Sequence, residues 1–449
     1  WQSRGQPRFQ NSGKNLVKKL RIGIAGLGTV AQGVLHLIKN NGNLMSDRTG
    51  IELVVQRIAS RSARPDVDLL GAAFSTDVHD LVADPEVDVV LELIGGEGLA
   101  KELIESALAA NKPVVTANKA VVAAHGDQLL AGGNVPLRFE AAVAGAIPII
   151  QSLSQGLAAN RINAIYGIIN GTCNYMLTVM EEEGLAFNEV LAQAQALGYA
   201  EADPAFDIDG IDAAHKLTIL AALGFATSYD FSALYIEGIT QIAAEDIQYA
   251  KELGFKIKHL GIAAHTPAGL ETRVHPALVP SSALLASVNG VMNAVQVMSD
   301  GAGETLFSGP GAGGAATASA VLADVLALGS LVAAHTSDAL GQSQDKPAVD
   351  TGPAIRRVAM DDIPSACYLR IPTVDRPGVF AQVASALSAH SISIEAVIQK
   401  EQPSADASVS IVIMTNVVVE SVLNAALSEL SALDTVVGDI TRIRVAPTH

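Results

Sequence analysis

The stretch LRIGIAGLGTVAQGVLHLIKN, residues 20–40, decides the fold of the first part of the chain. A short apolar run turns directly into a glycine-rich segment, and an apolar pattern with helical spacing follows. Gly26 and Gly28 stand at the first two positions of G-x-G-x-x-G. Ala31 takes the third position, and Gly33 follows it. Between a strand and a helix, this pattern predicts that the helix N-terminus holds the pyrophosphate of a dinucleotide, with an ordinary tight turn as the alternative.

Further apolar runs predict the remaining strands of a parallel sheet. They lie at residues 51–59, 87–94, 113–116 and 137–143. Together with the intervening helical segments, they predict an α/β domain with a doubly wound, Rossmann-type sheet over residues 19–150. Ligands of such sheets bind beyond the carboxyl ends of the strands, so Thr116 and Lys119 are expected at the cofactor crevice.

The end of the second predicted strand bears on the choice of cofactor. NAD-specific sites usually place a carboxylate there for the ribose hydroxyls. Here the strand is followed by Ser60, Arg61 and Ser62, so the carboxylate is missing and a cation that suits a 2′-phosphate is present. We therefore favour NADP(H), with NAD(H) and a merely solvated Arg61 as the alternatives.

The pattern changes after Pro148, and residues 151–330 are expected to form a central α+β domain for substrate binding and dimerisation. Its strands are predicted at residues 161–170, 254–264, 269–278 and 294–297, with a helix over 148–157 before them. A second glycine-rich loop, residues 309–314, opens a helix of small residues. This loop either lies against a ligand or permits close helix packing, and the segment 300–330 is expected to close the first domain.

The stretch LGYAEADPAFDIDGIDAAHKLTIL, residues 197–220, gathers five carboxylates within twelve residues, and Lys216 follows one helical turn later. On the predicted helix, Asp212 and Lys216 stand at i,i+4 and share a face. A surface ion pair is the simplest alternative. However, a cluster of acids in so apolar a chain costs desolvation energy unless water, a partner or a substrate satisfies it. Asp209 is expected to cap the helix.

Composition limits the possible partners and location. The formal net charge of −17 argues against nucleic acid or an anionic membrane, because those contacts need clustered Lys and Arg. No apolar run reaches about 18 residues, so no membrane span is expected. Cys173 and Cys367 are too few for a disulfide framework and are expected to be reduced thiols of a cytoplasmic protein. Residues 1–18 carry no secretory signal and are expected to form a disordered tail.

The C-terminal part restarts the periodic pattern after a polar segment, residues 331–364, that is expected to be a linker with low order. Residues 365–449 show the order β-α-β-β-α-β, which predicts a ferredoxin-like unit. Between its first strand and first helix, Pro377 and Gly378 occupy the central positions of a tight turn.

With these residues in hand, the chain resembles the long, regulated kind of homoserine dehydrogenase that carries a C-terminal ACT domain. The resemblance covers residues 20–330 and 366–445. It rests on seven motifs in order: GLGTV (26–30), ELIGG (92–96), TANKA (116–120), FEAAVAGAIPII (139–150), IINGTCNY (168–175), GYAEADPAFDIDGIDAAHKL (198–217) and GPGAGGAATASAV (309–321). One departure is Ala31, where this family usually has Gly, and Ala is small enough for the position.

The resemblance implies reversible hydride transfer between L-homoserine and L-aspartate 4-semialdehyde with NAD(P), in the pathway to threonine, methionine and isoleucine. It implies a catalytic set of Lys119, Asp212 and Lys216. It implies substrate contacts by Gly171, Thr172, Glu201, Asp207 and Lys216, with Glu201 at the amino group. The implied cofactor residues are Gly26, Leu27, Gly28, Thr29, Val30, Arg61, Thr116, Lys119 and Gly313. A monovalent cation, typically sodium, is implied at Glu140, Val143, Gly145 and Ile147.

The chemistry of the reaction is consistent with a lysine at the reacting end. Hydride transfer to an aldehyde leaves a developing alkoxide, which needs a cation or a proton donor. The motifs contain no zinc-ligand constellation, and His215, their only histidine, is expected to point away from the face of Asp212 and Lys216. Lys216, or a water that it holds, is therefore the expected donor, with Lys119 as the other candidate.

The ACT resemblance rests on Asp375, Arg376, Pro377, Gly378 and Val379. Such domains pair and bind a small amino acid at this turn, and L-threonine is the effector that the resemblance implies. A non-binding dimerisation domain is the alternative. A homodimer or tetramer is expected, because the central sheet and the ACT unit both offer pairing surfaces. The competing functions are a dehydrogenase of another amino-acid semialdehyde and a non-catalytic amino-acid sensor.

Overall fold

The computed structural model describes residues 17–131, 134–334, 355–400 and 408–447. Most of the expected N-terminal tail therefore lies outside the described residues. Lys18, which the sequence places in that tail, already belongs to the first strand and pairs with Ile51. No helix in the described ranges combines the length and the apolarity that crossing a bilayer requires.

The first domain is built on a six-stranded sheet in which every neighbouring pair is parallel. The spatial order is β3-β2-β1-β4-β5-β6. The strands are β1 (Lys18–Ala25), β2 (Ile51–Ala59), β3 (Ala73–Ser75), β4 (Val89–Glu92), β5 (Val114–Thr116) and β6 (Leu137–Arg138). The order reverses between β1 and β4, which confirms the predicted Rossmann-type sheet and places its ligand crevice at that point.

The strand predicted over 137–143 is wrong beyond Arg138. Residues Glu140–Ala142 form a 3-10 turn instead. The Glu140 carboxylate accepts hydrogen bonds from the N–H groups of Ile150 and Gln151, so the chain turns towards α5 (Ile149–Gln151) rather than continuing along the sheet. The helix predicted over 148–157 is confirmed, although its second half, Ser152–Gly156, is a π-helical turn.

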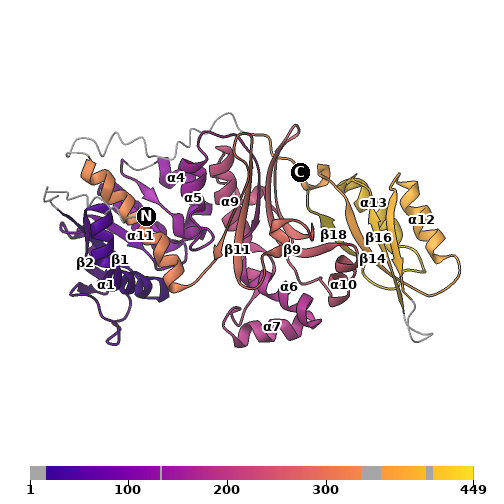
Figure 1. Cartoon of the computed structure of the whole chain (residues 1–449), viewed down its shortest axis with the longest axis horizontal. Helices are drawn as coiled ribbons and strands as arrows, with labels where there is room; N and C mark the ends of the chain where they lie inside the picture. The colour runs from indigo at the N-terminus through magenta and orange to yellow at the C-terminus, as the bar shows by residue number, and fades with distance from the viewer. Residues whose placement is uncertain (1–16, 132–133, 335–354, 401–407, 448–449) are drawn as a thin grey trace, which may run out of the picture.

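Five helices pack around this sheet: α1 (Thr29–Thr49), α2 (Asp80–Ala83), α3 (Gly98–Ala109), α4 (Lys119–Ala131) and α11 (Gly314–Ala334). Although α11 is distant in sequence, it lies beside α1 (Figure 1) and packs on the first domain. The earlier part of the segment 300–330, which was also expected to close this domain, instead forms β12 (Gly303–Pro310) of the ten-stranded central sheet. The contact between α1 and α11 requires glycine, because a Cβ on Gly33 would lie 2.4 Å from the carbonyl oxygen of Gly314. The second glycine-rich loop therefore does permit close helix packing.

The central and C-terminal parts share one ten-stranded sheet. Its central strands are β12 (Gly303–Pro310), β11 (Met292–Ser299), β7 (Ile162–Ile168), β9 (Phe255–Thr266) and β10 (Gly269–Pro280), and the short β8 (Tyr235–Ile236) pairs with β10. The sequence analysis missed β12. The helices of this part are α6 (Gly171–Glu183), α7 (Phe187–Ala196), α8 (Ala205–Ile208), α9 (Ile211–Phe225) and α10 (Ala244–Glu252).

The C-terminal unit has the predicted ferredoxin-like order. Its elements are β14 (Cys367–Thr373), α12 (Val379–Ala389), β15 (Ile394–Gln399), β16 (Val409–Thr415), α13 (Glu420–Ser431) and β18 (Thr441–Val445). The strand order in space is β18-β14-β16-β15. Because β18 also pairs in parallel with β10, the ACT sheet continues the central sheet edge to edge (Figure 1).

The expected linker is only partly inside the described residues. Residues 335–354 lie outside them. Residues 356–358 pair with Leu270 of the central sheet, contrary to the low order expected: the Leu270 N–H donates to the Arg356 carbonyl (2.8 Å), and the Val358 N–H donates to the Leu270 carbonyl (3.1 Å). Residues Met360–Asp362 form a 3-10 turn. Pro364–Ser365 (β13) then pairs with Val418–Val419 (β17).

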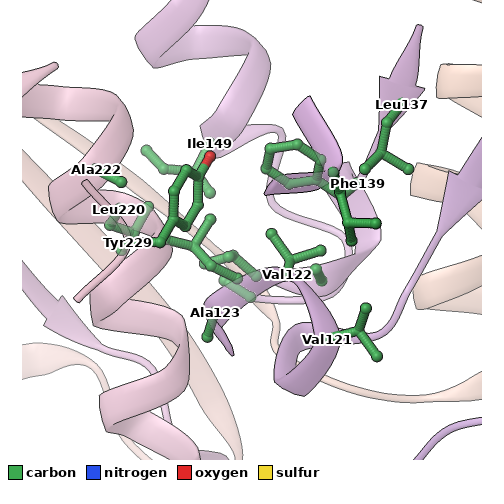
Figure 2. Packing of buried hydrophobic residues seen from close by; sticks show 14 of the residues in the cluster. Val121, Val122, Ala123, Leu137, Phe139, Ile149, Leu220, Ala222 and Tyr229 are labelled. Atoms are coloured by element: carbon green, nitrogen blue, oxygen red, sulfur yellow. The ribbon is translucent and has the colours of Figure 1, made fainter. Parts of the chain in front are cut away.

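A hydrophobic cluster of mainly aliphatic residues, with Phe139, Phe225 and Tyr229 among them, joins the first domain to the central one. Figure 2 shows part of it, in which Val122 of α4, Leu220 of α9 and the ring of Tyr229 surround the same packed region. The Tyr229 ring lies where a side chain on Gly126 would be, 2.8 Å from the position of its Cβ. This packing fixes α4 against α9, and the N-terminal ends of these two helices carry the candidate site.

Candidate active site

The glycine-rich turn lies where the strand order reverses. Gly26 has φ +100°, and a Cβ there would lie 2.7 Å from the Leu93 carbonyl oxygen, so this position requires glycine. Gly28 is the residue that precedes α1, and the space where its Cβ would stand is open. Thr29 and Val30 follow in the first helical turn, whose N–H groups are suited to an anion.

A cavity of about 580 Å³ adjoins this turn. Val30, Glu92, Asn118, Lys119 and Phe206 are among the residues that line it. It therefore reaches from the first helix of the Rossmann domain to α8 of the central domain. Its size is in the range of a small-molecule site.

Glu92 is a buried acid at the carboxyl end of β4. Its carboxylate accepts hydrogen bonds from the Ile94 N–H (2.9 Å), the Gly95 N–H (3.3 Å) and the Thr116 hydroxyl (2.5 Å). Burial raises the pKa of Glu92. Thr116 is itself buried, so its hydroxyl supports Glu92 and receives the Asn118 N–H (3.0 Å) rather than lining the cavity.

The other expected cofactor residues occupy different environments. Arg61 is exposed just beyond β2. Leu27 is buried in the hydrophobic core of the first domain. Gly313 has φ +124° and directly precedes α11, where Gly314 contacts Thr29. The structure thus brings the second glycine-rich loop next to the first glycine-rich turn. This position is compatible with both expected roles of the second loop, contact with a ligand and close helix packing.

Asp212, Lys216 and Lys119 form a chain of ion pairs across the domain boundary. Lys216 Nζ donates to Asp212 Oδ2 (2.7 Å) and to the carbonyl oxygen of Ile169 (2.7 Å). Lys119 Nζ lies 3.0 Å from Asp212 Oδ1. Burial alone would raise the pKa of Asp212, but the two ammonium groups hold it well below its usual range. Because Asp212 and Lys216 are both buried, they are not the surface pair of the simplest alternative.

Asp207 joins this group through Asn170, a residue that the sequence analysis did not select. Asn170 Nδ2 donates to Asp207 Oδ1 and to Asp212 Oδ2, each at 2.8 Å. Thr172 Oγ1 donates to the carbonyl of Tyr199 (2.8 Å) and more weakly to Asp207 Oδ2 (3.3 Å). A usable sequence signal did exist, since an Asn between a strand and a helix is a typical N-cap.

The other residues that the sequence predicts at the substrate lie in different local settings. Glu201 is exposed in the loop before α8. Gly171 begins α6, and a Cβ there would lie 2.9 Å from the Val291 carbonyl oxygen. The expected cap by Asp209 is wrong: Gly210, with φ +89°, occupies the N-cap of α9, and the Asp209 N–H closes α8 on the carbonyl of Ala205.

His215 has an aromatic environment rather than a polar one. Its ring stacks on Phe231, with centroids 4.6 Å apart, and contacts Phe206 at 5.6 Å. Burial and the nearby Lys119 lower the pKa of His215, so the imidazole is neutral near pH 7. Lys119 Nζ lies over the Phe206 ring, 5.5 Å from its centroid, and both residues line the cavity, so the stack adjoins it.

The loop expected to hold a cation is irregular and buried. Ala144 and Gly145 have φ +54° and +56°. The two Glu140 carboxylate oxygens accept the Ile150 and Gln151 N–H groups, both at 2.8 Å, and burial raises the Glu140 pKa to about 7. The carbonyl of Ile147 accepts the Ile149 N–H. Within the described ranges there is no cluster of three His, Cys, Asp or Glu side chains suited to a metal.

The expected effector turn lies in the ACT unit, away from this site. Gly378 has φ +91° and precedes α12, and the Arg376 N–H donates to the Val374 carbonyl (3.2 Å). Residues 375–378 are exposed, whereas Val379 is buried. The first four residues of this turn therefore stay accessible to a ligand at the end of β14.

Three family models match the chain. The model described as Homoserine dehydrogenase matches residues 148–326. The model described as Homoserine dehydrogenase, NAD binding domain, matches residues 26–134, and the ACT domain model matches residues 368–435.

Two similar sequences and one crystal structure match nearly the whole chain, and a second solved structure matches about two thirds of it. Homoserine dehydrogenase of Pseudomonas aeruginosa is 47% identical over 436 residues, which cover 96% of this chain and 99% of that protein. The Bacillus subtilis protein of the same name is 38% identical and covers 94% and 96%. A crystal structure of a homoserine dehydrogenase from Thiobacillus denitrificans has a TM-score of 0.89 at 45% identity, with 96% and 98% covered. A hyperthermophilic archaeal homoserine dehydrogenase in complex with NADPH has a TM-score of 0.59 at 27% identity, with 69% of this chain and 98% of that one covered.

Proposed function

The chain belongs to the homoserine dehydrogenase family, and from this premise we propose how its site performs the reaction. It is an NAD(P)-dependent oxidoreductase that acts on a CH–OH group and carries an ACT domain. This family membership removes the non-catalytic sensor from consideration. We propose that its substrates are L-homoserine and L-aspartate 4-semialdehyde, on the pathway to threonine, methionine and isoleucine.

The ion-paired chain Lys119–Asp212–Lys216 carries this proposal: Asp212 and Lys216 are buried, and Lys119 lines the cavity. A nicotinamide dinucleotide fits the residues present, because the space over Gly28 is open and the adjoining cavity reaches Lys119. The dinucleotide supplies or accepts the hydride. In the reducing direction, Lys216 Nζ donates a proton to the alkoxide oxygen that develops on the aldehyde and regains one from solvent. Asp212 and the Ile169 carbonyl hold this ammonium group in place.

The substrate is held by groups around these lysines. Glu201 is the proposed partner of the substrate amino group, and Asp207, Gly171 and Thr172 complete the binding surface. Lys119 contacts the reacting oxygen or the cofactor from the Rossmann side. Turnover of L-homoserine with NADP⁺ and with NAD⁺, followed by the absorbance of the reduced cofactor, tests the assignment. A purified, folded protein that reduces neither cofactor with homoserine would refute it.

Cofactor preference is proposed to be for NADP(H). The exposed Arg61 beyond β2 supports this choice, and the archaeal relative named above is in complex with NADPH. Arg61→Ala is expected to raise KM for NADP⁺ at least several-fold and to leave KM for NAD⁺ nearly unchanged. An equal change in both KM values would mean that Arg61 does not contact a 2′-phosphate.

We also propose that a monovalent cation, sodium, binds at Glu140, Val143, Gly145 and Ile147. The support is a buried carboxylate beside an irregular, positive-φ backbone that can present carbonyl oxygens. Cation exchange from sodium to tetramethylammonium should lower the unfolding temperature. No change in that temperature would count against the site.

Regulation is proposed to occur through L-threonine at the turn Asp375–Val379. Arg376→Ala changes an exposed residue and should raise the threonine concentration for half-inhibition about tenfold without changing kcat. An unchanged inhibition curve would place the effector elsewhere.

The proposed oligomer is at least a homodimer, since Leu284 and Val291 stay exposed beside the central sheet. A monomer mass by light scattering would contradict this, and fractionation would test the proposed cytoplasmic location.

A further inference from the structure

Asn170 lies in the short connection between β7 of the central sheet and α6, next to the proposed active site. Its side-chain Oδ1 accepts the Cys173 N–H (2.7 Å) and so caps α6. The preceding carbonyl, that of Ile169, accepts Lys216 Nζ. The two adjacent residues Ile169 and Asn170 therefore bind the proposed proton donor and cap α6, respectively.

The amide nitrogen of Asn170 is fully used by two carboxylates. Nδ2 donates one hydrogen to Asp207 Oδ1 and the other to Asp212 Oδ2, both at 2.8 Å. The orientation of the amide is unambiguous, because the Cys173 N–H must face an oxygen. Asn170 is only 4% exposed, so water does not compete strongly for these bonds.

Two carboxylates that approach each other in a buried site repel, and one of them then tends to hold a proton. Burial raises the pKa of Asp207 and the charge of Asp212 adds to this, whereas the Asn170 hydrogen bond and Lys216 oppose it. A primary amide suits this position because it donates two hydrogens from one nitrogen while it accepts at its oxygen. Asp212 Oδ2 also accepts Lys216 Nζ, so the position of this oxygen affects the ammonium group.

We propose that Asn170 is a positioning residue of the dehydrogenase reaction, which holds Asp207 and Asp212 side by side as carboxylates and thereby orients Lys216. It acts through these residues and does not touch the reacting atoms. The inference rests on the proposed function, which assigns Asp207 to substrate binding and Lys216 to the proton transfer.

Asn170→Asp is the informative variant, because it keeps an oxygen for the Cys173 N–H but removes both donors. We expect kcat/KM for the semialdehyde to fall at least tenfold at pH 7 and the acid limb of its pH profile to move up by about one unit or more. The dissociation constant of NADPH should stay within twofold. Asn170→Ser also keeps the cap and lacks one donor, so it replaces the first variant if that one fails to fold.

Asn174→Asp is the matched control. Asn174 lies on α6, the helix that Asn170 caps, and is as deeply buried at 1% exposed. Its Nδ2 faces the carbonyls of Val288, Gly290 and Met292, and its Oδ1 faces Lys258 Nζ (3.4 Å), so it contacts neither Asp207 nor Asp212 through these bonds. It should change the unfolding temperature and leave the acid limb in place. If Asn170→Asp is folded and its acid limb matches the wild type, the inference is overturned.

A readout without turnover separates this inference from the proposed function. Carbon-13 carboxyl NMR of aspartate-labelled protein, assigned with Asp207→Asn, follows the Asp207 pKa directly. We expect that pKa to rise by about one unit or more in Asn170→Asp. An unchanged pKa refutes the role of Asn170 even if the wild type is active. If the Asp207 pKa rises in Asn170→Asp but the wild type does not oxidise homoserine, only the proposed substrate is refuted.

Discussion

At the scale of single residues, the active site depends on charges that are buried but compensated. Asp212 and Lys216 are buried, and each has a charged or hydrogen-bonded partner on more than one side. Removing one member of such a pair leaves an uncompensated charge, which commonly costs 3–5 kcal/mol. A substitution of one of these residues is therefore expected to lower both the activity and the free energy of unfolding, so both must be measured.

Lys216→Met replaces the proposed proton donor with an apolar side chain of similar length. We expect kcat in the reducing direction to fall by about 10²–10⁴-fold, as for loss of a general acid, while NADPH still binds. Lys101→Met is the control, since Lys101 forms a partly exposed i,i+4 pair with Glu105 on α3. That variant should keep wild-type kcat, and wild-type turnover by a folded Lys216→Met would remove Lys216 from the mechanism.

Lys258 provides a pH prediction at the same scale. Its Nζ is buried and donates to the Val288 carbonyl (2.7 Å) and to Asn289 Oδ1 (3.0 Å), and burial lowers its pKa to about 8. Between pH 8 and about 10.5 the unfolded chain binds more protons at this residue than the folded chain does. The Lys258 contribution to the free energy of unfolding therefore rises with pH over this window, by about 3 kcal/mol.

The difference in unfolding free energy between wild type and Lys258→Met measures this contribution. It should grow as the pH is raised from 8 to about 10, as chemical denaturation at several pH values can show. A constant difference would mean that the ammonium group titrates at its ordinary pKa.

At the scale of elements, the contact between α1 and α11 decides whether the Rossmann domain closes. Gly33→Ala would place a Cβ 2.4 Å from the Gly314 carbonyl oxygen, a backbone atom that cannot turn aside. We expect a loss of about 1–3 kcal/mol in unfolding free energy and weaker NADP(H) binding, because the two helices must separate beside Thr29.

Gly42→Ala is the control on the same helix, where a Cβ meets nothing within 4 Å. It should stabilise the protein by about 0.5–1 kcal/mol, because glycine inside a helix costs that much relative to alanine. Thermal unfolding compares the two variants. Equal effects of the same sign would show that close packing is not what Gly33 provides.

At the scale of the whole molecule, the ACT unit is joined to the catalytic part by a continuous sheet and by a buried charge network. Arg444 of β18 binds Glu420 through two hydrogen bonds (2.6 and 3.1 Å) and Glu237 of the central part through a third (2.8 Å). Arg444 is almost fully buried. If the turn Asp375–Val379 binds the proposed effector, β18 and this charge network provide an ordered connection from the ACT unit to the central domain.

Arg444→Met removes one of the two arginines that pair with the buried Glu420, while Arg442 Nη1 remains 2.6 Å from its Oε1. We expect a loss of about 1–3 kcal/mol in unfolding free energy and a loss of the proposed threonine inhibition at temperatures where catalysis persists. Arg64→Met is the control, because Arg64 pairs with Asp66 on an exposed loop; it should change stability by less than about 0.5 kcal/mol. Unaltered inhibition in a destabilised Arg444→Met would separate the network from regulation.

The elements themselves could be predicted because their signals are local. Strand β2 occupies the predicted residues, and the i,i+4 spacing correctly predicted that Asp212 and Lys216 contact each other. The failures have two causes: the neighbouring Gly210 occupies the cap expected of Asp209, and the Glu140 carboxylate accepts the N–H of Ile150, ten residues away, where the apolar pattern continues. A side-chain hydrogen bond to a distant N–H leaves no periodic trace in the sequence.

What the sequence by itself determined is the kind and order of the domains, the glycine positions of the dinucleotide turn and the pair Asp212–Lys216. These features depend on helix and strand periodicity over a few residues. Only the tertiary structure decided that Lys119 meets Asp212, that Asn170 joins Asp212 to Asp207, and that β18 extends the central sheet. Those contacts join segments far apart in the chain, because a buried charge or a sheet edge is satisfied by whichever partner the packing of the whole molecule delivers.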